Sequence, residues 1–77
     1  MDRRLLEEHL TMVERHVAEG EVHLLRQRQL VSDLRRDGHD TTQAEGLLTA
    51  FEASQAAHCE HRDRLRLELS SIQPSLL

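Results

Sequence analysis

A heptad pattern across the first half of the chain constrains the fold more than any other feature. Between residues 2 and 36 there is no proline and only one glycine, and apolar residues recur at alternating steps of four and three. This spacing keeps one stripe on a single side of an α-helix for four repeats. It predicts a first helix over about residues 2–36, about 52 Å long. The stripe consists of Leu6, Leu10, Val13, Val17, Gly20, Leu24, Gln27, Val31 and Leu34.

The end of this helix is marked by charge and by a glycine. Arg35 and Arg36 place positive charge at the negative end of the helix dipole. Gly38 supplies the left-handed conformation that commonly ends a helix. We therefore predict a turn over residues 37–41.

A second helix is predicted over about residues 42–71. Thr42 and Glu45 have the spacing of a capping box, and the two residues before Thr42 are alternative caps. Pro74 disfavours helix at the residue before it, so residues 73–77 are expected to be a frayed tail. The apolar stripe of this helix has a polar middle. It reads Ala44, Leu47, Leu48, Phe51, Gln55, His58, His61, Arg62, Leu65, Leu69 and Ile72.

Composition agrees with an all-α class and excludes several functions. Hydrophobic residues make up 38% of the chain and Phe51 is the one aromatic residue, so the core is thin. A net charge of −4 argues against a nucleic-acid partner. No apolar run is long enough to span a membrane, and the mixed charges do not fit a membrane-surface helix. A single cysteine and no signal-peptide pattern favour the cytoplasm.

The short turn forces the two helices to lie antiparallel as neighbours. Folding the chain about His39 pairs residue i with roughly residue 78 minus i, which sets Gly20 near His58. Glycine inside a helix costs about 1 kcal/mol relative to alanine, so Gly20 is expected to make room for a bulky side chain, His58 or His61. The alternative is that Gly20 is merely tolerated.

Further apolar residues lie beside both stripes and remain uncovered in a lone hairpin. They are Leu5, Met12, Leu25, Leu30, Leu47, Ala50 and Leu67. A second identical hairpin would cover them in a two-fold symmetric four-helix bundle. We therefore expect a homodimer. Its expected core and interface residues are Leu6, Leu10, Val13, Val17, Gly20, Leu24, Val31, Leu34, Leu48, Phe51, Leu65, Leu69 and Ile72.

Histidines are the main candidates for chemistry. His9, His16 and His23 are seven apart and share one edge of the first helix, and His58 and His61 are three apart in the second. With Glu19, they suggest an alternative in which His16, Glu19, His23, His58 and His61 bind zinc or another first-row transition metal. The leading interpretation is structural, with these side chains at an interface and with no cofactor.

Catalysis is not expected. Cys59 directly follows His58, and neighbours in a helix point about 100° apart and do not face each other. The sequence also lacks a strand-turn-helix elbow or glycine-rich loop that would supply an oxyanion site. The segment from His61 to Leu65 is similar to the phosphoacceptor helix of some sensor histidine kinases. That helix normally comes first in its hairpin, so phosphotransfer at His58 or His61 is kept only as an alternative.

Three further sequence segments, spread along the chain, carry a resemblance to a known group of proteins. They are His16-Val17-Ala18-Glu19-Gly20-Glu21, Asp37-Gly38-His39-Asp40-Thr41 and His61-Arg62-Asp63-Arg64-Leu65. In this order they resemble a group of short, uncharacterised helical-hairpin proteins of rhizobia and related alphaproteobacteria. The resemblance implies a small free-standing cytoplasmic protein and carries no activity. The sequence thus predicts a non-catalytic protein-protein interaction or regulatory adaptor that partners itself, with another protein as a possible further partner.

Overall fold

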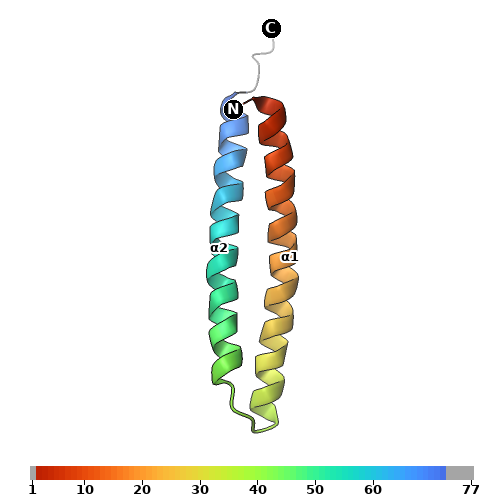
Figure 1. Ribbon diagram of the computed structural model, residues 1–77, viewed down its shortest axis with the longest axis vertical. Helices are drawn as coiled ribbons and strands as arrows, with labels where there is room; N and C mark the ends of the chain where they lie inside the picture. The colour runs from red at the N-terminus through yellow and green to blue at the C-terminus, as the bar shows by residue number, and fades with distance from the viewer. Residues whose placement is uncertain (1, 73–77) are drawn as a thin grey trace.

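The computed structural model describes residues 2–72, which form two long helices joined by a short turn (Figure 1). Helix α1 spans Arg3–Arg36 and helix α2 spans Thr42–Ser71, and the described residues contain no strand. The helices run antiparallel and pack side by side along their length. The all-α hairpin is confirmed. The expected frayed tail, residues 73–77, lies outside the described residues.

Both ends of α1 are closed by hydrogen bonds that the local sequence provides. At the start, the backbone N–H of Arg4 donates to Oδ1 of Asp2 at 2.8 Å, which makes Asp2 the N-cap. At the end, Gly38 has a φ of 77°. The N–H groups of Gly38 and His39 donate back to carbonyl oxygens in the last turn, at 3.2 and 2.9 Å. This pair of bonds is a Schellman motif, and it stops the helix at the glycine.

The start of α2 differs from the expected capping box. The backbone N–H and the hydroxyl of Thr42 both donate to Oδ1 of Asp40, at 3.0 and 2.8 Å. Glu45 accepts instead from the Thr41 hydroxyl and from the Arg35 guanidinium. The capping-box prediction is wrong because Arg35 and the Thr41 hydroxyl hold the Glu45 carboxylate. The alternative is confirmed for Asp40, which accepts from the first N–H of the helix, whereas the Thr41 side chain makes no capping bond. The bonds from the Thr42 backbone and side chain lower the pKa of Asp40.

The core is a thin seam supplied mostly by α1. The buried apolar side chains are Leu6, Val13, Val17, Leu24, Val31 and Leu65. The other expected core residues Leu10, Gly20, Leu34, Leu48, Phe51 and Leu69 are half-buried, and Ile72 is exposed. In the polar middle of α2, Arg62 donates to Asp63 at 3.1 Å. This bond raises the pKa of Arg62 and keeps its guanidinium at the surface, while its stem stays half-buried.

The register differs from the expected one by three residues. Gly20 faces Gln55, not His58, and a Cβ at Gly20 would overlap Oε1 of Gln55. The Nε2 of Gln55 donates to the carbonyl oxygen of Val17 at 2.8 Å. The expectation that His58 or His61 fills the room left by Gly20 is therefore wrong. An amide takes that room because it reaches a backbone carbonyl of α1 there.

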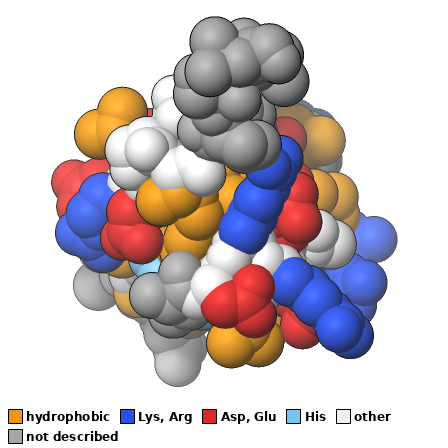
Figure 2. Space-filling model, turned by 90° about the horizontal axis from the view of Figure 1, so that it is seen from above, with side chains coloured by type: hydrophobic (Ala, Val, Ile, Leu, Met, Phe, Trp, Pro, Cys, Tyr) orange, Lys and Arg blue, Asp and Glu red, His pale blue; other side chains and the backbone are white. Residues whose placement is uncertain are grey.

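Charges of both signs mix at the open end of the hairpin. Seen from above (Figure 2), Arg and acidic side chains lie side by side around the rim, and hydrophobic side chains show between them. Among the side chains that Figure 2 draws in colour, neither sign of charge is gathered on one side. The end view therefore gives no support for an electrostatic partner of one sign.

Candidate functional site

The two flanks of the hairpin have different chemistry. In the heptad pattern of α1, residues 14, 21, 28 and 35 lie on one side of the buried stripe, and residues 9, 16, 23 and 30 lie on the other. In an antiparallel pair each set lies beside α2 at its own edge of the seam. We call the first edge the ion-pair flank and the second the ring flank, after the contacts described next.

Three salt bridges between the helices close the ion-pair flank. They join Arg66 Nη2 to Glu14 Oε2 at 2.9 Å, Arg28 Nη2 to Glu52 Oε2 at 3.7 Å, and Arg35 Nη2 to Glu45 Oε1 at 2.6 Å. All six side chains are about half exposed, so each pair contributes no more than about 1 kcal/mol. The bridges pair three of the four charged residues that α1 places on this flank, namely Glu14, Arg28 and Arg35.

The ring flank carries three cross-helix ring pairs, and each begins at a heptad-spaced histidine of α1. His9 meets His61 with ring centroids 5.0 Å apart, His16 meets His58 at 5.5 Å, and His23 meets Phe51 at 5.9 Å. The planes of the first pair are nearly perpendicular, at 81°. These separations lie within the usual range for aromatic pairs. The spacing on α1 was readable from sequence, whereas the ring facing each histidine depends on the register.

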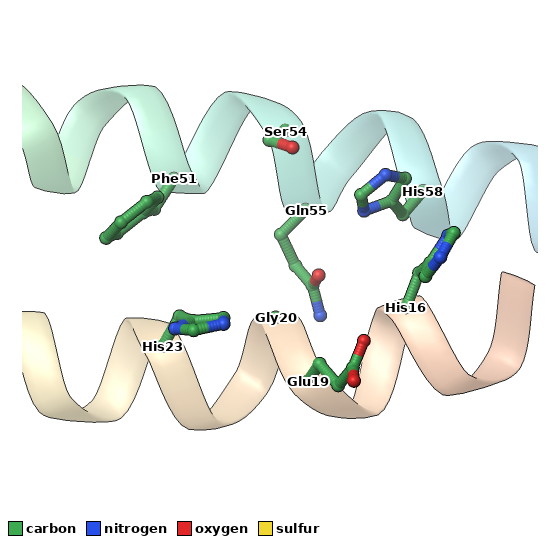
Figure 3. A pocket seen from close by; sticks show the side chains of 8 residues that line it. All are labelled: His16, Glu19, Gly20, His23, Phe51, Ser54, Gln55 and His58. Carbon is green, nitrogen blue, oxygen red and sulfur yellow. The ribbon is translucent and has the colours of Figure 1, made fainter.

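A cavity of about 210 Å³ lies midway along the ring flank (Figure 3). It is lined by His16, Glu19, Gly20, His23, Phe51, Ser54, Gln55 and His58. Figure 3 shows the Gln55 side chain crossing from α2 to Gly20, between the His16–His58 pair and the His23–Phe51 pair. The Oε1 atom of Gln55 is buried and has no hydrogen-bond partner among the described residues. The amide therefore places a polar group between the two ring pairs.

Two further hollows continue the ring flank toward its ends. One, of about 360 Å³, is lined by Leu5, Glu8, His9 and Met12 near the start of α1. The other, of about 580 Å³, lies near the turn, and Leu30, Leu34, Leu47 and Ala50 are among its lining residues. Three hollows thus follow one another along the ring flank, and apolar side chains are part of the lining of both end hollows.

The five candidate metal ligands are only partly brought together. His16, Glu19, His23 and His58 line the central cavity, whereas His61 pairs with His9 farther along the flank. Within residues 2–72, no three His, Cys, Asp or Glu side chains gather in a way that would hold a metal ion. The imidazoles that do face each other form two pairs, His9 with His61 and His16 with His58. Cys59 is a free, half-buried thiol.

Two glutamines have a larger structural role than their sequence positions suggested. Gln27 is 8% exposed, and its Nε2 donates to the carbonyl oxygen of Ala44 at 2.9 Å. Gln55 makes the equivalent bond in the other direction, from α2 to Val17. Both glutamines occupy positions in the apolar stripes. A polar residue at such a position was the one sign in the sequence of their structural role. A buried amide at a seam position needs a partner across the seam.

Comparison of the chain with protein-family models, with curated proteins and with solved structures finds no match. Over the described residues, neither α1 nor α2 combines the length and the hydropathy that crossing a bilayer requires.

Proposed function

We propose that the chain is a non-catalytic protein-protein interaction or regulatory adaptor that works as a homodimer, with two hairpins forming a four-helix bundle. The observation that carries this proposal is the balance between covered and uncovered apolar side chains. Among residues 2–72, six apolar side chains are buried, whereas eight large ones are exposed, from Ile72 at 41% to Leu67 at 73%. Where such side chains gather in one place, as Leu30 and Leu47 do in one hollow, exposed apolar surface is typical of association surfaces.

The size of the chain supports the same conclusion. A domain below about 70 to 80 residues rarely gains more than a few kcal/mol from a single core. Here that core is one seam between two helices, without a third layer. A second hairpin supplies a further layer of helices. Two-fold symmetry closes the assembly, because each copy uses the same surface and no interface surface is left uncovered.

The mass of the purified chain in solution tests the proposal. Sedimentation equilibrium over a wide concentration range is expected to give twice the chain mass of 8.9 kDa. Helical content by circular dichroism should be measured on the same samples. A species of 8.9 kDa that still melts cooperatively at the highest concentration would contradict the proposal.

A second candidate function is transition-metal binding through the cross-helix imidazole pairs. Two imidazoles on one tetrahedral metal, with metal-nitrogen bonds near 2.0–2.1 Å, have ring centres roughly 5 Å apart. The His9–His61 and His16–His58 separations, 5.0 and 5.5 Å, agree with that spacing. Water would complete the coordination, since no third protein ligand is gathered at either pair among residues 2–72.

Thermal melts with added Zn²⁺ or Ni²⁺ test this candidate. Metal that binds only the folded state at 100 times its Kd stabilises by about 2.7 kcal/mol. We expect His58→Ala to lose the shift that depends on the His16 pair. His39→Ala is the matched control because His39 is exposed in the turn. No shift in the wild type at millimolar metal would eliminate the candidate.

A further inference from the structure

We infer that the dimer forms through the ring flank, with a second copy of this chain as its occupant. The inference rests on the proposed homodimer and adds which surface of the hairpin forms the dimer interface. Four exposed apolar side chains on this flank, Leu5, Met12, Leu30 and Leu47, line hollows on either side of the ring pairs. The hollows lie in a row along one flank of the hairpin, with the ring pairs toward the middle.

The remaining exposed apolar side chains do not form such a row. In the heptad pattern Val22 and Leu25 lie on the side of α1 away from the ring flank, and Leu67 lies on the outer side of α2. Leu25 and Leu67 are the most exposed of all, at 70% and 73%. Leu67 is the one apolar residue of the four that line its shallow hollow, and Ile72 lies apart, just past the end of α2. Scattered single side chains of this kind are ordinary surface.

Charge also separates the flanks. Covering the ion-pair flank would remove from water three salt bridges that are about half exposed now, and desolvating charges opposes association. Rings make the cross-helix pairs of the ring flank. Each of its hollows has a single Asp or Glu in its lining, Glu8, Glu19 and Asp40 in turn, and none of the three is in a salt bridge between the helices. An interface with an apolar interior and a few charges at its edge is the usual arrangement.

The size of the ring flank fits a second hairpin. A helix of 34 residues is about 51 Å long, and the hairpin is 17 Å wide. A face of those dimensions offers roughly 850 Å², close to the roughly 800 Å² per partner of a stable interface. An identical hairpin has the length to cover the whole row, so that both end hollows and the ring pairs between them are buried together.

A pair of matched substitutions on α1 tests this surface. Leu30 on the ring flank and Leu25 on the opposite side are 46% and 70% exposed, so a glutamate at either position leaves the hairpin core intact. Two-fold symmetry places two copies of each new carboxylate in any interface that contains it. We expect Leu30→Glu to weaken dimerisation by at least ~100-fold and Leu25→Glu to change it less than ~3-fold.

Sedimentation equilibrium gives the dimer dissociation constant of each variant. On α2 the same comparison uses Leu47→Glu on the ring flank and Leu67→Glu on the outer side. Loss of the dimer in the Leu25 or Leu67 variant, or a dimer that survives both Leu30→Glu and Leu47→Glu, would overturn the ring flank as the interface. A monomeric wild type would instead overturn the homodimer itself. The two failures are therefore distinguishable.

A measurement on the wild type covers the case in which a glutamate variant does not fold. His16 and His23 are exposed in the single chain, and so is His39 in the turn. We expect carbethoxylation of His16 and His23, followed by mass spectrometry, to slow by at least ~5-fold relative to His39 as concentration rises through the dimer range. Equal rates in a sample that is dimeric by mass would refute the ring-flank interface.

Discussion

Replacing Gly20 by alanine measures whether the Gln55 amide fills the room that this glycine leaves. In an open helix interior, glycine to alanine stabilises by roughly 1 kcal/mol. At position 20 the new Cβ overlaps Oε1 of Gln55, so the flexible amide must swing away. Its hydrogen bond to the Val17 carbonyl, worth about 1 kcal/mol, is then lost. The two effects nearly cancel, and we expect between no change and about 1 kcal/mol of destabilisation.

Gly46 provides the matched control within the same chain. It lies inside α2, and a Cβ added there meets nothing within 4 Å. Gly46→Ala should therefore show the full helix gain of roughly 1 kcal/mol, which raises the Tm of a domain this size by about 4–8 °C. Both substitutions reduce the freedom of the unfolded chain equally, so the difference between them isolates the contact with Gln55.

A double-mutant cycle with Gln55→Ala completes the test. Without the amide, Gly20→Ala should stabilise as Gly46→Ala does, which gives a coupling of about 1–2 kcal/mol between positions 20 and 55. Urea unfolding followed by circular dichroism at one protein concentration is the suitable assay, since association makes apparent stability depend on concentration. Equal gains for Gly20→Ala and Gly46→Ala in the wild-type background would refute the contact and with it the register.

Three further substitutions test the ends of the helices and the core. Gly38→Ala forces a side chain into a φ of 77° and is expected to cost about 1–2 kcal/mol in a urea melt. Because hydrogen bonds from Thr42 hold the pKa of Asp40 below its ordinary 3.8, the stability it contributes is present above that value and is lost as pH falls through the lower, folded pKa. Urea melts from pH 6 to pH 3 should therefore show the wild type losing stability relative to Asp40→Asn, and a constant difference would contradict this assignment. Leu65→Ala empties the one buried apolar position of α2 and should cost about 2–5 kcal/mol, whereas a cost below about 1 kcal/mol would show that Leu65 is not core.

The elements of the fold were predictable because each depends on local sequence. The heptad stripe gives α1 one buried side over its whole length, and the positive φ of Gly38 ends it where a residue without a Cβ was expected to do so. The ring flank was partly predictable for the same reason. Three histidines seven apart must share an edge of α1 whatever lies opposite them.

The register was not predictable because it depends on contacts between the helices, whereas the cap of α2 was predictable in part, since Asp40 was one of the alternatives. A stripe defines which side of a helix is buried and leaves open how far the helix slides along its neighbour. In the observed register, Gln55 passes Gly20 and donates a hydrogen bond to the Val17 carbonyl. Similarly, the Thr42–Glu45 spacing allows a capping box, but Arg35 arrives from the other side of the turn and holds Glu45.

The buried amides, more than the apolar side chains, determine which surface this hairpin presents. A seam of leucine and valine alone packs comparably well in several registers, because its side chains are similar in size and lack direction. Moving α2 along α1 would separate Gln27 and Gln55 from their carbonyl partners, and each buried amide left unpaired costs about 1–3 kcal/mol. The same register sets His9 against His61 and places Leu30 and Leu47 in one hollow. The register in which both glutamines are paired is therefore also the one that forms the ring pairs and the hollow near the turn.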